Sequence, residues 1–476
     1  MVKYIYQAKE CDLMLNKQLI EDIITAALST GGDFAEVFVE DRTNSGIVMI
    51  GGKIENTMSG RDYGVGIRIF KGFNSVYAYT NKSDKDTLIA TAKKAAAAVE
   101  GNNGSSIINL IKSDVNNVHD IKIDPNTIDK TRKVEIMKRA YDTAFNYDDL
   151  ITQVTVNLAD HVQNIMVANS EGLWKEDKRV RSRLAIQSIA SKNGEMQSGF
   201  YGPGAMSGYE FFENLDVEKY AKETSRIALT MVNAKYSPSG KMPVIIDNGF
   251  GGVIFHEASG HGLEAASVAK GLSVYCDKIG QKVASELVTA IDDGTIPNEW
   301  GSINIDDEGT PSQRNVLIEK GILKGYMIDK LNARRMNMDV TGSSRRQSYR
   351  YPPTSRMTNT FIDNGKSTPE EIIANTEKGL YAKYMGGGSV NPSTGEFNFA
   401  VMEGYIVENG KIIEPVRGAT LIGKGIDVLN KIDMVGNNLS FGQGMCGASS
   451  GSIPTNVGQP MIRVSEITVG GRENEV

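Results

Sequence analysis

The first half of the chain contains one pattern twice, a helical stretch followed by strand-like segments, and this repetition constrains the fold more than any other feature. Apolar residues at helical spacing cover residues 12–28, and a second helix of this kind is predicted over residues 127–146. The strand-like segments cover residues 35–41, 45–50, 65–70, 75–81, 151–158, 162–169 and 181–190. Turn signals such as Gly51, Gly52 and residues 169–172 separate them. Strands joined by such short turns predict an antiparallel sheet covered by helices.

A short polar linker divides the chain into two regions. Residues 237–240 read Ser-Pro-Ser-Gly, which is typical of a linker or turn. Beyond them the sequence is rich in Gly, Asn and Asp, and short apolar strands outnumber long helices. We therefore expect an α+β protein. Its N-terminal region, residues 1–236, has helices and an antiparallel sheet and contains two units, about 1–118 and 119–236. A β-rich C-terminal domain over residues 237–476 carries a candidate metal-site helix.

Charge and cysteine content narrow the function. The chain has 52 Lys and Arg against 58 Asp and Glu, so its net charge of −6 provides no basic field for nucleic acid or an anionic membrane. No segment reaches the roughly 18 apolar residues of a membrane helix, and the N-terminal sequence lacks the apolar core of a secretory signal. The three cysteines, Cys11, Cys276 and Cys446, cannot form a disulfide framework. These features predict a cytoplasmic protein.

The pattern with the clearest chemistry is His-Glu-x-x-x-His on the predicted helix, formed by His256, Glu257 and His261. In the familiar H-E-x-x-H zinc pattern the two imidazoles lie about 40° apart around the helix, whereas a five-residue spacing separates them by roughly 140°. A one-residue π-bulge would cancel this mismatch, and such bulges are frequent at functional sites. Gly260, directly before His261, would make the distortion easy to adopt. The pattern therefore predicts a metal site only if the helix is irregular.

A catalytic zinc ion takes three protein ligands, and the sequence offers two candidates for the third. Glu264, three residues after His261, is suited either to bind the metal or to accept a hydrogen bond from an imidazole. Cys446, in a Gly-rich segment, offers a thiolate. The residues by themselves leave this choice open. The other cysteines and histidines have no metal-site context and are interpreted as structural, packing or surface residues: Cys11, Cys276, His119 and His161.

Several segments together resemble the TldD/PmbA metalloproteases, specifically the TldD branch. They are, in chain order, SGRDYGVGIRIF, AYTN, FHEASGHGLE, RMTNTFIDNG, GGGSVNPSTGEFNF, RGATLIGKG and MCGASSGSIPTNVGQP. The HExxxH pattern alone is not specific, but this ordered set spans nearly the whole chain. The resemblance implies a zinc ion bound by His256, His261 and Cys446, with Glu257 as general base and acid.

The resemblance also implies a dimeric protease that cleaves unfolded peptides, in some cases while ribosomal peptides mature. A TldD-type subunit pairs there with a PmbA/TldE-type subunit that lacks the metal motif, so a homodimer and such a heterodimer are both expected. The main rival interpretation is a non-catalytic peptide-binding subunit whose zinc is structural. Glu257 argues against this rival, because a structural site has no use for a general base.

Two further expectations concern the substrate. Arg345, Arg346 and Tyr349 lie in a basic loop and are candidate contacts to the substrate or to the oxyanion of the transition state; the other interpretation is a solvated basic loop. The β-rich domain is expected to offer a strand edge to an extended peptide, because pairing through the backbone tolerates varied sequences.

Overall fold

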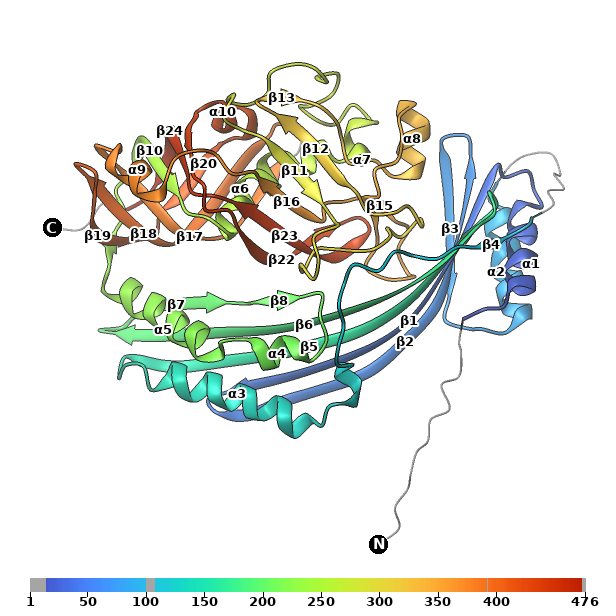
Figure 1. Ribbon diagram of the computed structural model, residues 1–476, viewed down its shortest axis with the longest axis horizontal. Coiled ribbons are helices and arrows are strands. Elements are labelled where there is room, and N and C mark those ends of the chain that lie inside the picture. Colours follow the sequence, from blue (N-terminus) through green and yellow to red (C-terminus); the bar gives the residue numbers. More distant parts are fainter. Residues whose placement is uncertain (1–13, 100–107, 392, 473–476) are drawn as a thin grey trace, which may run out of the picture.

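The computed structural model describes residues 14–99, 108–391 and 393–472. An N-terminal region is built on one long sheet, and a C-terminal domain lies against one face of that sheet (Figure 1). The mixture of helices and mainly antiparallel sheets confirms the predicted α+β class. Cys11 lies outside the described residues. No helix within them is both long enough and apolar enough to cross a membrane.

Two long hairpins form the centre of the N-terminal sheet. β1 (Phe34–Ile50) turns into β2 (Lys53–Lys71), and β5 (Ile151–Asn169) turns into β6 (Leu173–Lys192). β1 and β5 pair antiparallel along most of their length, so the two helix-and-strand units share one sheet. Its shorter strands are β3 (Asn74–Thr80), β4 (Ile111–Lys112), β7 (Glu195–Tyr201) and β8 (Gly204–Ala205). The strand order is β3-β2-β1-β5-β6-β4, and β7 and β8 also pair with β6.

The central strands are longer than the sequence predicts. Segments 35–41 and 45–50 belong to one strand, β1, and segments 151–158 and 162–169 both belong to β5. Polar residues interrupt the apolar alternation, as in residues 42–44, but they pair with β2 on one side and with β5 on the other. Backbone pairing therefore continues through these polar positions.

Helices cover the two ends of this sheet (Figure 1). α1 (Lys17–Leu28) and α2 (Lys85–Ala96) pack together at one end, and α3 (Lys130–Phe145) and α5 (Val217–Asn233) pack together at the other. Each pair forms its own apolar core with the strands. Both predicted helices are present, but α1 begins only at Lys17, where the side chain of Asn16 caps it. The short elements are the 3-10 turn η1 (Pro125–Thr127) and α4 (Glu210–Asn214).

The C-terminal domain contains a closed sheet and an open sheet. The closed sheet arises because pairing along β17-β10-β24-β20-β18 returns from β18 to β17. Its strands are β10 (Gly240–Ile246), β17 (Lys378–Asn391), β18 (Glu396–Glu408), β20 (Thr420–Lys424) and β24 (Ile462–Gly470), with β9 (Lys235–Tyr236), β19 (Lys411–Arg417) and β21 (Ile432–Val435) attached.

The open sheet has the order β13-β12-β11-β16-β23-β22 and ends at β22, which lies beside the N-terminal sheet (Figure 1). Its strands are β11 (Ala290–Asp293), β12 (Arg314–Glu319), β13 (Ile322–Leu323), β16 (Asn359–Ile362), β22 (Ser440–Ala448) and β23 (Gly451–Gln459). The remaining elements are the strand pair β14 (Ser344–Arg345) and β15 (Thr354–Ser355), and helices α8 (Lys330–Met336), α9 (Pro369–Ala374) and α10 (Gly425–Asn430).

Buried ion pairs join the two regions. Arg68 of β2 pairs with Glu36 of β1 at 2.9 Å and also with Glu308 of the C-terminal domain. Arg346 of the C-terminal domain reaches back to Glu36 at 2.7 Å. All four side chains are almost inaccessible to water. Removing one partner would leave a buried charge uncompensated, so this network favours one fixed arrangement of the two regions.

Candidate metal centre

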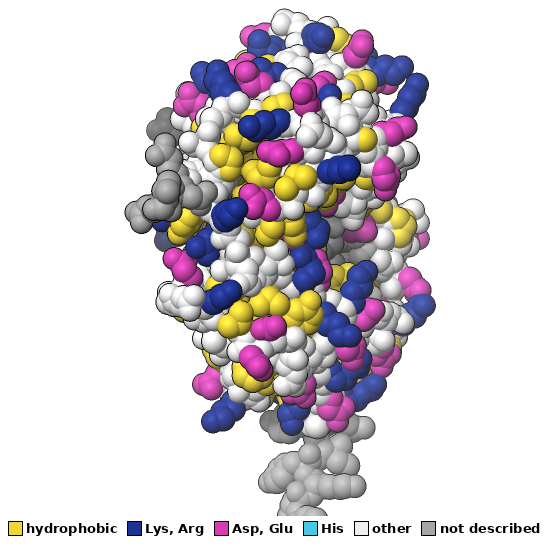
Figure 2. Space-filling model, turned by 90° about the vertical axis from the view of Figure 1, so that its left-hand side faces the viewer, with side chains coloured by type: hydrophobic (Ala, Val, Ile, Leu, Met, Phe, Trp, Pro, Cys, Tyr) yellow, Lys and Arg dark blue, Asp and Glu magenta, His cyan; other side chains and the backbone are white. Residues whose placement is uncertain are grey.

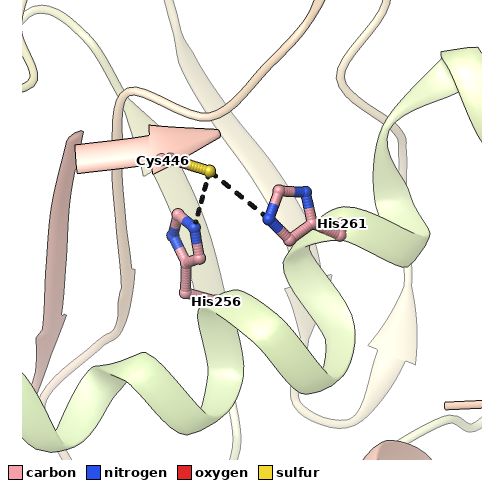
Figure 3. A group of neighbouring side chains, drawn as sticks. All are labelled: His256, His261 and Cys446. Carbon is pink, nitrogen blue, oxygen red and sulfur yellow. Dashed lines mark hydrogen bonds between the residues drawn. The ribbon is translucent and has the colours of Figure 1, made fainter. Parts of the chain in front are cut away.

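The segment that carries the His-Glu motif is helical but irregular. Its parts are, in order, a 3-10 turn (Phe250–Gly252), α6 (Val253–Phe255), a π-helical turn (His256–Gly260), a second 3-10 turn (His261–Leu263) and α7 (Ala265–Val268). The N–H of His261 donates to the carbonyl oxygen of His256, which is the hydrogen bond of a π-helix. This wide turn confirms the predicted distortion and brings both imidazoles toward one sulfur atom (Figure 3).

Gly260 serves the turn in a different way from the one predicted. Its backbone is in the ordinary right-handed helical region, with φ −53° and ψ −52°, so the turn does not need the conformational freedom of glycine there. A Cβ atom at this position would lie 2.3 Å from Sδ of Met357. Met357 therefore packs directly against the backbone at Gly260, and a side chain at this position would force Met357 to move.

Three side chains from two distant parts of the sequence converge (Figure 3). Nε2 of His256 lies 3.2 Å from Sγ of Cys446, and Nε2 of His261 lies 3.3 Å from the same sulfur. The three donor atoms lie within 4.8 Å of one another. With Zn–N of about 2.1 Å and Zn–S of about 2.3 Å, tetrahedral coordination places nitrogen and sulfur about 3.6 Å apart. The donor types and the two nitrogen–sulfur distances therefore suit a zinc ion, and Cys446 rather than Glu264 lies with the two imidazoles.

The charges of this group suit a cation. Burial would raise the pKa of Cys446, but the charge of His256 and hydrogen bonds from both imidazoles lower the pKa to about 3. Burial would lower the pKa of His261, but Glu264 and Cys446 raise that pKa well above its ordinary value. The sulfur is therefore a thiolate at neutral pH, which is the form that binds metals. Metal binding would displace the proton shared by this group.

Glu264 orients one of the ligands. Its Oε2 lies 3.1 Å from Nδ1 of His261, on the side of the ring opposite Nε2. A carboxylate at Nδ1 keeps the proton on that nitrogen and leaves Nε2 free for a metal. Glu257 lies closer to the donor atoms: its Oε2 is 3.7 Å from Nε2 of His261, and a quarter of its side chain is exposed. A carboxylate thus stands beside the ligand group where water can reach it.

Arg356 supports the centre and had no predicted role. Its side chain is fully buried, and its Nη2 donates to the carbonyl oxygen of Cys446 at 2.5 Å. Its Nε lies 3.7 Å from Oε1 of Glu264. Arg356 therefore connects the strand that bears the cysteine to the carboxylate that orients His261. The sequence contained one relevant signal, because Arg356 begins the segment RMTNTFIDNG that resembles the family.

The three candidate substrate contacts lie between the two regions. Tyr349 donates its backbone N–H to Glu40 of β1, and Arg346 pairs with Glu36. Arg345 is buried and donates to the carbonyl oxygen of Met357 at 2.7 Å. Within the described residues, no hydrogen bond or ion pair joins these three side chains to the metal-binding group.

The remaining histidines and Cys276 lie outside the centre. Cys276 is half-buried against the C-terminal core, and its thiol donates to a backbone carbonyl. His119 is buried, and its Nδ1 accepts a hydrogen bond from the N–H of Asn298 at 3.1 Å. His161, on β5, lines a cavity between the two regions.

Comparison with known proteins accounts for almost the whole chain. Family sequence models described as PmbA/TldA metallopeptidase domain 1, central domain and C-terminal domain match residues 35–99, 123–232 and 239–471. The chain belongs to the TldD/PmbA family. A metalloprotease TldD homolog from Haemophilus influenzae is 38% identical over 470 residues, which cover 96% of this chain and 97% of the relative. A metalloprotease TldD homolog from Buchnera aphidicola subsp. Acyrthosiphon pisum is 36% identical over 461 residues, 95% of each chain.

Solved structures of two other proteins have the same fold as this chain. TldE from Thermococcus kodakarensis superposes with a TM-score of 0.76 at 20% identity, covering 95% of this chain and 100% of that one. A protein from Thermotoga maritima gives a TM-score of 0.78 at 22% identity, covering 95% of this chain and 99% of that one. At these identities the likeness concerns the fold alone.

Proposed function

We propose that this member of the TldD/PmbA family is a zinc-dependent peptidase that hydrolyses unfolded, extended peptides. The observation that carries the proposal is the convergence of His256, His261 and Cys446 beside the carboxylate of Glu257. Three protein ligands leave one coordination position open, as in catalytic zinc sites, whereas structural sites use four. The name of the relatives, metalloprotease TldD homolog, agrees with metal-dependent proteolysis.

Each residue of the centre has a distinct role in this proposal. The two imidazole Nε2 atoms and the Cys446 sulfur hold the metal. A bound zinc ion supplies Lewis-acid polarisation of the scissile carbonyl and lowers the pKa of water toward neutrality. Glu257, which is not in the ligand group, accepts a proton from the attacking water and passes it to the leaving amine. Glu264 fixes the orientation and the protonated nitrogen of His261.

A large cavity beside β22 is the proposed path of the peptide. It has a volume of about 1260 Å³ and lies between α5 and β7 on one side and β17 and β22 on the other. Residues 440–444 of β22 line it and end two positions before Cys446. α5 and β7 lie toward the left-hand side of Figure 1, which is the side that faces the viewer in Figure 2. A peptide in this cavity would approach the metal centre along the strand that carries the cysteine.

The sequence predicts that a peptide pairs with a strand edge, but some backbone groups of β22 are already hydrogen-bonded. β22 is the last strand of its sheet, but the carbonyl oxygen of Gly444 already accepts from Nε1 of Trp300, and that of Cys446 accepts from Arg356. We therefore expect the peptide to lie beside β22 rather than to add a regular strand along its whole length.

We further propose that the protein acts in the cytoplasm, paired either with a second copy of itself or with a TldE-type subunit. The fold shared with TldE supports such pairing. Acidic and basic side chains are interspersed on the face shown in Figure 2, and the net charge is −6, so we propose no nucleic-acid partner. Purification from the native cell tests the pairing: recovery of self-dimers alone and recovery of a paralogue in equal amount distinguish the two arrangements.

Zinc analysis combined with a peptidase assay tests the proposed function. The wild-type protein is expected to hold one zinc ion per chain and to cleave an unfolded peptide; a chelator should abolish cleavage and added zinc should restore it. Cys446→Ser should lose both zinc and cleavage, whereas the matched variant Cys276→Ser should keep both. Full zinc occupancy without cleavage of any peptide would instead favour the non-catalytic subunit with structural zinc.

A further inference from the structure

A second cavity between the two regions is lined by an unusual number of arginines. It has a volume of about 350 Å³. The arginines in its lining are Arg42, Arg179, Arg181, Arg183, Arg345 and Arg346. Asp307 is the acidic residue in the same lining, so basic groups far outnumber acidic ones there.

Two of these arginines have carboxylate partners. Arg179 pairs with Asp307 at 2.7 Å, and Arg346 pairs with Glu36 at 2.7 Å. Asp307 also accepts the backbone N–H of Arg346, so its carboxylate is fully engaged. Both oxygens of the acidic residue in the lining therefore already accept hydrogen bonds, and Asp307 acts on the other arginines only through its charge.

Among the residues that the structure describes, no carboxylate forms an ion pair with the other four arginines. Arg181 is 2% exposed and Arg345 is 4% exposed, yet both donate only to backbone carbonyl oxygens and, for Arg181, to a methionine sulfur. Arg183 likewise donates only to carbonyl oxygens. The buried Nε of Arg42 has no hydrogen-bond partner among the described residues, and burial lowers the pKa of Arg42 although the charges of Glu40 and Asp62 raise it. None of the four forms an ion pair within 4.0 Å in the part of the chain that the structure describes.

Burying so many positive charges close together is energetically unfavourable. Burial, together with the charges of Arg179 and Arg356, outweighs the attraction of Asp307 and Asp292 and lowers the pKa of Arg345 to about 10. Buried charges without partners are costly, and a bound anion would offset that cost. The arrangement therefore favours an anionic ligand over structural pairing alone.

The cavity lies next to the metal centre and next to the proposed peptide path. Met445 lines it and directly precedes Cys446. Arg345 donates to the carbonyl oxygen of Met357, whose side chain packs against Gly260 of the π-helical turn. Arg183 lines both this cavity and the larger one. A peptide that reaches the metal centre along β22 therefore passes the arginines.

We propose that the arginine-lined cavity binds a carboxylate group of the peptide substrate, so that peptides with a carboxylate near the cleaved bond are preferred. This inference rests on the proposed peptidase function. A guanidinium group binds the two oxygens of a carboxylate side by side, which gives orientation as well as affinity. The carboxylate has two sources with this same chemistry, the C-terminus of the peptide and an Asp or Glu side chain.

Binding to zinc-loaded Glu257→Gln protein tests the inference separately from catalysis. Three fluorescent peptides of one extended sequence are compared by anisotropy: a Gln peptide with an amidated C-terminus, the same peptide with Glu in place of Gln, and the Gln peptide with a free C-terminus. At least one carboxylate peptide is expected to bind about tenfold more tightly than the neutral one. The peptide that gains affinity identifies the source of the carboxylate.

Variants assign the preference to the cavity. Arg345→Met should abolish it. Arg350→Met should preserve it, because Arg350 lies in the same loop but is half exposed, pairs with Asp62 and does not line the cavity. If Arg345→Met does not fold, competition on the Glu257→Gln protein replaces it: glutarate should displace the carboxylate peptide more strongly than chloride at equal ionic strength. Equal binding of all three peptides, an unchanged preference in Arg345→Met, or no advantage of glutarate over chloride would overturn the inference. A carboxylate preference without cleavage by the wild-type protein would overturn only the peptidase proposal.

Discussion

Glu264 shows how one residue behind a ligand shapes the metal centre. Its carboxylate contacts Nδ1 of His261 and lies away from the sulfur, so it determines which nitrogen of that imidazole carries the proton. Arg356 stands on its other side and also holds the backbone of Cys446. A buried carboxylate and a buried arginine therefore contact two of the three candidate ligands.

Glu264→Gln is expected to weaken zinc binding about 10- to 100-fold, because the amide holds the imidazole less strongly and increases its basicity less. Competition with a chromogenic chelator measures the affinity. Glu319→Gln is the matched control, since Glu319 is exposed and pairs only with Lys324 in the described structure. Equal zinc affinity in Glu264→Gln and the control would show that Glu264 does not orient His261.

Some residues of the site could be predicted from the sequence and others could not. The spacing of His256 and His261 with Glu257 is local, and the resemblance to the family pointed to Cys446. Arg356 has no local pattern, because its role depends on packing against a strand 90 positions away. The cavity arginines were also missed as a group, since they come from strands and a loop that belong to both regions. Only Arg345 and Arg346 of that group were noticed, as part of a basic loop.

At the scale of elements, the irregular helix is the feature that sequence geometry predicted best. A regular helix would separate the two imidazoles by roughly 140°, so a wider turn was required. The sequence did not reveal the close contact between Gly260 and Met357, because Met357 comes from a different part of the fold. Strand lengths were underestimated for a similar reason: pairing with two neighbouring strands carries β1 and β5 through polar residues.

Gly260→Ala should destabilise the protein by about 1–3 kcal/mol, because the added methyl group would overlap the sulfur of Met357. The same substitution made in a Met357→Ala protein should cost much less, since the backbone angles of Gly260 suit alanine. Urea denaturation of the two single variants and the double variant measures this coupling. An equal cost of Gly260→Ala in both backgrounds would indicate a conformational requirement for glycine instead of a steric one.

At the scale of the whole molecule, the two regions are held together by contacts between distant residues. Arg68 bridges Glu36 and Glu308, and the segment around His119 crosses to Asn298 of the C-terminal domain. Composition and periodicity predicted the α+β class because they report local structure. They could not predict how the C-terminal domain lies on the long sheet, since that arrangement depends on pairs far apart in the sequence.

His119 makes the contact between the regions sensitive to acid. Burial, aided by the charge of Arg181, lowers the pKa of His119 to about 4 in the folded protein. The unfolded chain, with a histidine pKa near 6.5, therefore binds more protons between about pH 6.5 and pH 4. The contribution of His119 to the free energy of unfolding should be fully present above about pH 6.5. It should decrease as the pH falls toward 4, by at most about 3 kcal/mol.

His119→Asn should remove this part of the pH dependence, because the amide oxygen can accept the hydrogen bond from Asn298 and does not titrate. Urea denaturation at pH 7 and pH 4.5 compares the variant with the wild type. Between pH 7 and pH 4.5 the wild type is expected to lose more of its free energy of unfolding than the variant. Equal losses in the two proteins would mean that His119 does not contribute to the acid sensitivity.

The central claim is that Glu257 moves the proton while His256, His261 and Cys446 hold the metal. Its most direct test measures cleavage of an unfolded peptide and zinc content on the same samples of wild-type and Glu257→Gln protein. The account predicts one zinc ion per chain in both proteins and a rate about 10²- to 10⁴-fold lower in the variant. Cleavage at the wild-type rate by zinc-loaded Glu257→Gln protein would contradict it.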